Sequence, residues 1–246
     1  SHDATRSYSS NTGVSVRKVT EGASSSSLSV NGYYPPGALH CVRTVDEDGV
    51  TVQTFTDNLG RTVLERKTLS STQKADTYYV YDGAGRLTWV ITPEGSALLG
   101  ISTNWSIDDA DAAAYCYRYT YDGLGRLTER RQPGRDAEYF VYDPAGRLVA
   151  QQDGNLRNDG RWILSRYDAF GQVTGRFLSE AYALTFAGLT AAFDAEPEPP
   201  GVYALLGNTL IYSARYGSRK DSHVGHCYIA GVVISQYYHS YAVSDK

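Results

Sequence analysis

The feature that most constrains this chain is an eight-residue pattern, Tyr-Asp-x-x-Gly-Arg-Leu-Thr, which recurs along its middle part. A repeat with a fixed register determines the fold, because each copy must form the same local structure. Three copies are close to the pattern, the one before them is degenerate and the one after them is weaker. Their Asp residues lie 25, 40, 21 and 25 positions apart, at Asp57, Asp82, Asp122, Asp143 and Asp168.

Each copy is predicted to be one β-hairpin. Alternating runs rich in Tyr, Val and Thr flank the Asp-x-x-Gly core, as in residues 77–81 and 86–91. Asp suits the first position of a type I turn, and Gly suits the left-handed position of a hairpin with a bulge. We therefore expect a positive φ at Gly85, Gly125 and Gly146. The Arg is expected to lie along the preceding Tyr rings or to pair with the Asp. The predicted turn residues are Asp57, Gly60, Arg61, Asp82, Gly85, Arg86, Asp122, Gly125, Arg126, Asp143, Gly146, Arg147, Asp168 and Gly171.

The predicted fold class is mainly β. An isolated hairpin is marginally stable in water, so successive hairpins should pair edge to edge. The result would be an antiparallel array that forms a curled sheet or a partial shell. A row of Asp residues also suggests calcium binding or catalysis. One Asp per hairpin is, however, what turn chemistry requires, and we favour the structural interpretation.

These units resemble the Rhs/YD-repeat family, which includes bacterial polymorphic toxins, insecticidal toxin-complex shell subunits and the animal teneurins. The resemblance is closest to large Rhs-like proteins of Bacteroidetes and covers residues 33–178 strongly and the last ten residues weakly. Outside the repeats it depends on Tyr33–Leu39, Thr51–Arg66, Gln152–Asn155, Gly160–Trp162 and Tyr237–Tyr241.

The resemblance implies a secreted or cell-surface bacterial protein whose hairpins form part of a hollow β-shell. Such a shell encapsulates, displays or delivers another domain, so the implied partners are neighbouring repeats and a C-terminal effector domain. The family's shells contain many more than five repeats, so the chain is expected to be a segment of one. The aspartate motif that ends the core of toxin-type members is absent from this sequence, so we assign it neither autoproteolysis nor toxicity.

Three regions are expected along the chain. Residues 1–30 read as a flexible leader: they are rich in Ser, Thr and Asn, and Ser1-His2 resembles the remnant of a cleaved tag. Residues 31–178 would form the hairpin array. Residues 179–246 would add a helix and a closing strand pair that continue the array. Two short helical insertions are expected, at 106–114 with Ser106 as its cap, and at 179–193 with Ser179 as its cap.

Composition excludes several classes of function. The net charge of −4 argues against a nucleic-acid partner, because phosphate binding requires clustered cations. The three Cys residues are widely spaced, which favours buried free thiols over a disulfide framework, although one bridge is an alternative. No nucleotide or nucleophile motif occurs, so we expect neither an enzyme nor a bound cofactor.

Two clusters of residues suggest a metal site. The first is zinc binding at His223, His226, Cys227 and His239, but residues three apart in a strand face opposite sides of a sheet. The second is calcium binding at Asp108, Asp109 and Asp111, which more simply occupy the first turn of a helix. No metal site is therefore predicted.

The 21 Tyr residues support a rival hypothesis, a carbohydrate-binding or adhesion module, since aromatic rings on a sheet stack against sugars. The alternative, which we favour, is that these rings form cross-strand pairs that hold the sheet together. A last expectation is that an unpaired sheet edge mediates dimerisation. The candidate glycan-binding residues are Tyr78, Trp89, Tyr117, Tyr119 and Tyr139.

Overall fold

A computed structural model describes residues 5–24, 26–100, 104–106, 109–168, 170–179, 185–194, 201–206, 209–214, 223–229 and 232–239. The chain divides into two compact units, which are treated separately below. Unit 1 comprises Ser1–Tyr121 and Glu129–Asp136, and unit 2 comprises Asp122–Thr128 and Ala137–Lys246. The division falls within the third hairpin, and not near residues 30 and 178 as the sequence suggested.

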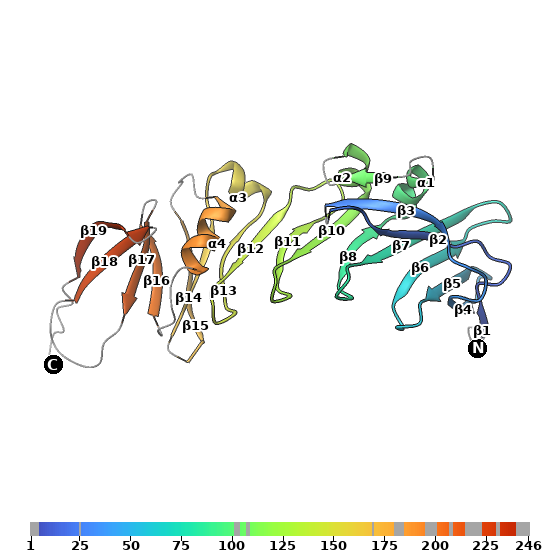
Figure 1. The fold of residues 1–246 in the computed structure, drawn as a ribbon, viewed down its shortest axis with the longest axis horizontal. Coiled ribbons are helices and arrows are strands. Elements are labelled where there is room, and N and C mark those ends of the chain that lie inside the picture. Colours follow the sequence, from blue (N-terminus) through green and yellow to red (C-terminus); the bar gives the residue numbers. More distant parts are fainter. Residues whose placement is uncertain are drawn as a thin grey trace. The chain divides into compact units, whose positions relative to one another are not determined.

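The predicted mainly β, antiparallel fold is confirmed. Twelve strands form one sheet in the order β1-β4-β5-β6-β7-β8-β10-β11-β12-β13-β14-β15, and they are labelled in Figure 1. Their bounds are β1 Thr5–Ser10, β4 His40–Val45, β5 Thr51–Thr56, β6 Thr62–Thr68, β7 Lys74–Tyr81, β8 Leu87–Ile91, β10 Cys116–Tyr121, β11 Leu127–Arg131, β12 Glu138–Tyr142, β13 Leu148–Gln152, β14 Ile163–Tyr167 and β15 Val173–Leu178.

The repeated hairpins account for most of this order. In the β5–β6, β7–β8, β12–β13 and β14–β15 pairs the register shifts at the residue before the turn Asp, as a bulge next to the turn requires. Alternation decides which face of each strand is buried. In β7, for example, Tyr78 and Val80 are buried, while Tyr79 and Tyr81 on the other face are only partly covered.

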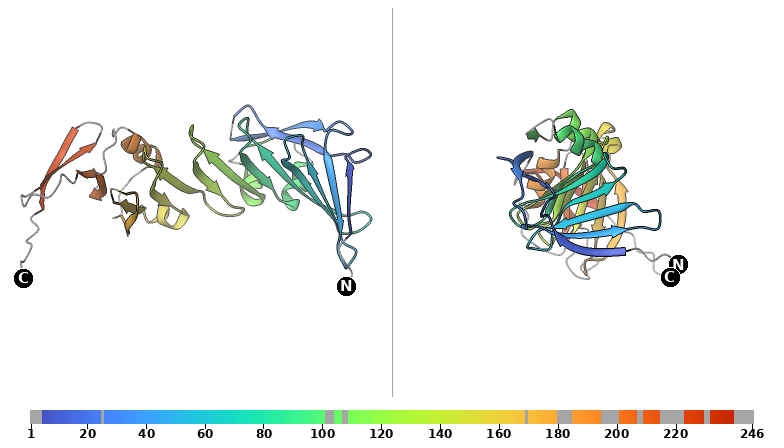
Figure 2. Two further views of the ribbon diagram at one scale, coloured as in Figure 1. Left: turned by 90° about the horizontal axis from the view of Figure 1, so that it is seen from below. Right: turned by 90° about the vertical axis from the view of Figure 1, so that its right-hand side faces the viewer.

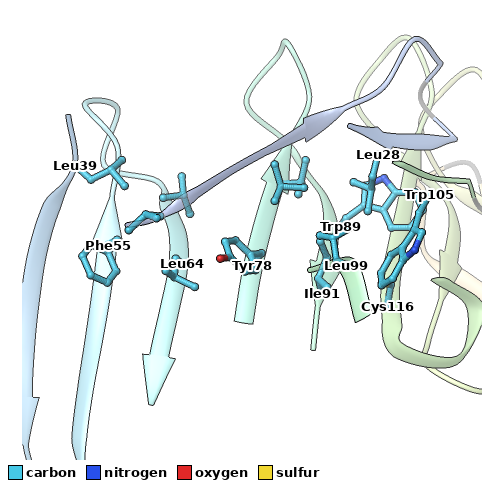
Figure 3. Packing of buried hydrophobic residues seen from close by; sticks show 14 of the residues in the cluster. Leu28, Leu39, Phe55, Leu64, Tyr78, Trp89, Ile91, Leu99, Trp105 and Cys116 are labelled. Atoms are coloured by element: carbon cyan, nitrogen blue, oxygen red, sulfur yellow. The ribbon is translucent and has the colours of Figure 1, made fainter. Parts of the chain in front are cut away.

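A second layer covers one face of the sheet in unit 1. It consists of β2 Arg17–Glu21, β3 Ser27–Tyr33 and β9 Asn104–Ser106, which form a three-stranded antiparallel sheet (Figure 2). Leu28 of β3 and Trp105 of β9 lie beside Trp89 of the main sheet in one buried cluster (Figure 3). The expectation of a flexible leader over residues 1–30 is therefore wrong, because the Ser-rich segment lies between two strands that contribute to this core.

Among the residues that the structure describes, four helices interrupt the strands, where two were expected. They are α1 Pro93–Leu99, α2 Ala110–Tyr115, α3 Gly154–Asn158 and α4 Phe186–Asp194. Thr92 caps α1 by accepting a hydrogen bond from the Gly95 N–H, and Pro93 occupies the first turn, where its missing N–H costs nothing. Asp153 caps α3 in the same way, by accepting from the Leu156 N–H at 2.8 Å.

The two expected helices exist, but they begin later than predicted. Ser106 belongs to β9, and Asp109 takes the cap position of α2. Ser179 does not cap α4: its N–H donates to the Trp162 carbonyl at 2.8 Å, and its hydroxyl accepts from the Trp162 N–H. At the start of α4, the Thr185 hydroxyl accepts a hydrogen bond from the Gly188 N–H. Both serines are polar enough to cap, but the Ser179 hydroxyl is already bonded to Trp162, and the Ser106 N–H and carbonyl are both bonded to Asp109, the residue at the cap position of α2.

Unit 2 has its own small core and a separate sheet. Val141, Val149, Trp162 and Leu164 are buried together with Leu189 of α4. Strands β16 Gly201–Leu206, β17 Thr209–Ala214, β18 His223–Ile229 and β19 Val232–His239 form a four-stranded antiparallel sheet. The last region therefore does not extend the twelve-stranded array, and it holds four strands where two were expected. The expected closing turn at residues 218–221 lies outside the described residues.

No helix among the described residues is long and apolar enough to cross a bilayer.

Candidate functional site

The five repeated turns share one backbone geometry. In the turn of the second copy, the Gly85 N–H donates to the Asp82 carbonyl at 3.0 Å, and the Asp82 N–H donates to the Arg86 carbonyl at 3.0 Å. The predicted positive φ is confirmed, with values of 81°, 81° and 79° at Gly85, Gly125 and Gly146. The degenerate and weak copies adopt it as well, since φ is 76° at Gly60 and 80° at Gly171.

The Asp carboxylate organises each turn from inside. One oxygen of Asp82 accepts from the backbone N–H groups of Ala84 at 2.9 Å and Arg86 at 2.8 Å, and the other accepts from Arg86 Nε at 2.7 Å. Asp57 and Asp122 make the same three kinds of contact with their own turns. The local role expected for Asp, and its pairing with the Arg four residues later, are both observed.

These contacts hold the carboxylates in the charged form. Burial alone pushes their pKa upward, but hydrogen bonds from the backbone and side chain of the turn Arg, and the charge of that Arg, outweigh it. The pKa of Asp57, Asp82 and Asp122 is consequently lowered from 3.8. The side chain of Asp143 has no exposed surface, and it pairs with Arg147 at 2.6 Å.

Each turn Arg also reaches the next hairpin. The guanidinium of Arg86 lies 5.0 Å from the ring centroid of Tyr121, and the Tyr121 hydroxyl donates to the Leu87 carbonyl at 2.9 Å. The same pair of contacts joins Arg61 to Tyr81, Arg126 to Tyr142 and Arg147 to Tyr167, with centroid distances of 5.0, 5.0 and 5.4 Å. The corresponding hydroxyls donate to the carbonyls of Thr62, Leu127 and Leu148.

We call this set of contacts the Asp–Arg–Tyr ladder; each rung is one turn Asp, its Arg and the Tyr of the following hairpin. The sequence placed the Arg on the preceding Tyr rings or on the Asp. The structure confirms the pairing with the Asp and corrects the ring, because the Arg stacks on the Tyr of the hairpin that follows. The repeated Tyr-Asp dipeptide thus serves two hairpins. Its Tyr contacts the Arg and a backbone carbonyl of the preceding hairpin, and its Asp stabilises the turn of its own hairpin.

The five turns give four rungs, because the first and last copies of the repeat each lack one of the ladder residues. The first turn is preceded by Thr56 in place of Tyr, and the last carries Gln172 in place of Arg. Gln172 still donates its backbone N–H to Asp168 at 2.8 Å, so the turn forms without the guanidinium. Forming the turn and coupling it to the next hairpin are therefore separate properties of the repeat.

A sixth turn of the same kind was missed. The Gly49 N–H donates to the Asp46 carbonyl, the carboxylate of Asp46 accepts from the N–H groups of Asp48 and Val50, and φ of Gly49 is 77°. Neither Tyr nor Arg accompanies this Asp-x-x-Gly, so the longer pattern does not match. The spacing of Asp and Gly alone would have identified it.

Two of the five candidate glycan-binding residues are buried, so they cannot stack on a sugar. Tyr78 is 6% exposed and Trp89 is 1% exposed, and both belong to the core of unit 1. Burial, followed by the charge of Asp76, raises the pKa of Tyr78 to about 12. The buried guanidinium of Arg118 lies 4.9 Å from the ring centroid of Trp89.

The other three candidates are partly exposed. Tyr117 and Tyr119 lie on β10, on the face opposite to the buried Cys116 and Arg118. Tyr139 is held differently, since its ring stacks on Phe186 of α4 with centroids 5.3 Å apart and lies 5.1 Å from the guanidinium of Arg157. The favoured expectation was cross-strand aromatic pairs, but the ring that stacks on Tyr139 is supplied by helix α4 and not by a strand, and Tyr117 and Tyr119 are only partly covered.

Among the residues that the structure describes, no group of three or more His, Cys, Asp or Glu side chains could hold a metal ion. The side chains of His223, His226, Cys227 and His239 lie outside the described part, as does all of Asp108. The backbone register pairs His223 with His239 and His226 with Gln236. Cys41 and Cys116 are free and buried, as expected, and the side chain of Cys227 is not described.

Comparison with known proteins adds no relative: no protein-family model matches the chain, and no curated protein matches it either.

Proposed function

We propose that this chain is a structural segment of an exported bacterial protein of the Rhs type, in which it forms part of a β-wall around another domain. The observation that carries the proposal is the Asp–Arg–Tyr ladder. In the four rungs, the three most distinctive side chains of the repeat stabilise their own turn and the contact with the neighbouring hairpin. Such a repeat extends a sheet by one hairpin at a time, which is what a wall requires.

The proposed wall keeps other proteins and solvent away from the enclosed domain, and it catalyses no reaction. The enclosed domain would be the effector that the family resemblance implies, and the protein would be secreted or displayed on the cell surface. The ladder favours this role over an exposed adhesion surface, because its Arg and Tyr side chains are occupied by one another and are not free to bind a ligand.

Limited proteolysis of the full-length protein tests the proposal. We expect the domain that follows this segment to resist a protease as long as the wall is intact. A Gly125→Ala/Gly146→Ala variant, which weakens two turns, should expose that domain, whereas Gly123→Ala in the same turn should not. If the following domain is cleaved in the wild-type protein as fast as it is cleaved alone, the proposal of an enclosing wall is wrong.

One observation supports the rival function, a carbohydrate-binding module. Tyr117 and Tyr119 lie two residues apart on the face of β10 that points away from the core, and both are partly exposed. Screening a glycan panel with wild type and a Tyr117→Ala/Tyr119→Ala variant decides the matter. Binding that this variant loses, while Tyr139→Phe keeps it, would favour the rival function over the wall.

A further inference from the structure

Strand β1 lies at one edge of the twelve-stranded sheet, next to β4 (Figure 1). Its first five residues are exposed, and only Ser10 is partly covered. Natural sheets usually protect such an edge with Lys, Pro or a bulge. In β1, Arg6 is the only charged residue, there is no Pro, and the register with β4 is continuous from Thr5 to Ser10.

The backbone of β1 offers hydrogen-bonding groups on its outer side. The Asn11 N–H donates to the Leu39 carbonyl at 3.1 Å, which marks Asn11 and Leu39 as a hydrogen-bonded pair. Such pairs alternate along an antiparallel ladder, so Ser9, Ser7 and Thr5 direct their N–H and C=O groups toward β4. Arg6 and Tyr8 therefore direct theirs away from β4. In the described part of the chain, no strand pairs with β1 on that side.

The side chains at the same two positions complement each other. Arg6 and Tyr8 lie on one face of β1, opposite to the face of Ser9, which pairs with the buried Cys41. Tyr8 is 74% exposed. If two β1 strands pair antiparallel about a twofold axis at Ser7, Arg6 of each copy lies opposite Tyr8 of the other. A guanidinium stacked on a Tyr ring is the same contact that joins neighbouring hairpins in the four rungs of the ladder.

We propose that two copies of this chain associate through their β1 strands, with Ser7 at the twofold axis and with each Arg6 over the Tyr8 ring of the other copy. The outward groups of Arg6 and Tyr8 would make the backbone hydrogen bonds of the new strand pair. The pairing goes beyond the enclosing wall proposed above: it uses none of the ladder residues, and it occupies the sheet edge at which a wall would otherwise add a further hairpin.

Sedimentation equilibrium of the purified chain tests this pairing, at loading concentrations from about 1 μM to about 1 mM. We expect a reversible monomer–dimer equilibrium in the wild type. Tyr8→Pro should leave the chain monomeric, since it removes an outward N–H but none of the hydrogen bonds between β1 and β4. Circular dichroism and the unfolding midpoint of this variant should match the wild type.

A residue swap provides the sharper control. Tyr8→Arg alone would place Arg opposite Arg in both pairs, and it should weaken association about tenfold or more. Arg6→Tyr/Tyr8→Arg restores Arg opposite Tyr and should return the dissociation constant to within about threefold of wild type.

Three results would overturn the proposal. The first is a wild-type chain that stays monomeric throughout the concentration range, and the second is a Tyr8→Pro variant that still dimerises. The third is a swapped variant that associates no better than Tyr8→Arg.

Discussion

Replacing Gly125 by Ala tests the turn geometry on which the ladder depends. Gly125 has a φ of 81°, in the left-handed region that a residue with a Cβ rarely adopts. The cost expected of the substitution is that of holding this backbone conformation. Holding a non-Gly residue in the left-handed region costs about 1–2 kcal/mol, so Gly125→Ala should lower the free energy of unfolding by about that amount.

Gly123, two residues earlier in the same turn, is the matched control. A Cβ there meets nothing within 4 Å, and Gly123 is not among the glycines with positive φ. Ala fits this conformation and restricts the unfolded chain, so Gly123→Ala should raise stability by about 0.4–1 kcal/mol. The same substitution is therefore predicted to have opposite signs at two positions in one turn.

Urea unfolding followed by circular dichroism measures both effects. With a slope of about 2 kcal/mol/M, Gly125→Ala should lower the midpoint by about 0.5–1 M. Hydrogen exchange provides a local readout, because the Asp122 N–H that donates to the Arg126 carbonyl should exchange faster in this variant. Equal stability of Gly125→Ala and Gly123→Ala would refute the left-handed turn and, with it, the position of Arg126.

Three further predictions concern groups that the ladder and the core hold. Tyr142→Phe keeps the ring over Arg126 but removes the hydroxyl that donates to the Leu127 carbonyl. It should lower the free energy of unfolding in urea by about 1 kcal/mol, and an unchanged free energy would mean that this hydrogen bond contributes nothing. Burial, followed by the charge of Asp111, raises the pKa of the Cys116 thiol to about 12. Iodoacetamide at pH 8 should therefore label Cys116 only after the protein unfolds, and mass spectrometry of the peptide measures this labelling. Stability should also depend on acid: a carboxylate whose pKa is lower in the folded state stabilises the fold above its unfolded pKa, and this stabilisation is lost as the pH falls through the folded pKa. The urea midpoint should therefore fall between pH 5 and about pH 3, and a flat profile would contradict the pairing described for Asp57, Asp82 and Asp122.

The sequence predicted what depends on local chemistry. The Asp-x-x-Gly spacing is sufficient for the turn, the bulge and the sign of φ, because all three are decided within five residues. For the same reason Gly60 and Gly171 adopt the same conformation although their repeats lack the Tyr or the Arg. The partner of each Arg was not predictable in this way, because the ring that it contacts is supplied by another hairpin.

The errors arise where tertiary packing overrides composition. The Ser-rich segment before Asn31 looked solvated, but Val19 and Leu28 lie in it and are buried against the main sheet. Pro93 follows the second hairpin directly, and Thr92 before it as a cap makes it the first residue of α1, a helix that was not expected. Trp89 looked like a surface aromatic because β8 alternates imperfectly, with Thr88 and Trp89 both buried. For the Ser-rich segment and for Trp89, no local pattern reveals the burial without knowledge of the covering sheet.

The central claim is that the Arg of one hairpin stabilises the next hairpin through its Tyr. A double-mutant cycle on Arg126 and Tyr142, whose guanidinium and ring centroid lie 5.0 Å apart, measures that coupling directly. Urea unfolding of wild type, Arg126→Ala, Tyr142→Leu and the double variant should give a coupling free energy of about 0.5–1 kcal/mol, as for a partly exposed cation–π contact. A coupling within error of zero would contradict the account, because the Arg would then contribute nothing to the next hairpin through its Tyr.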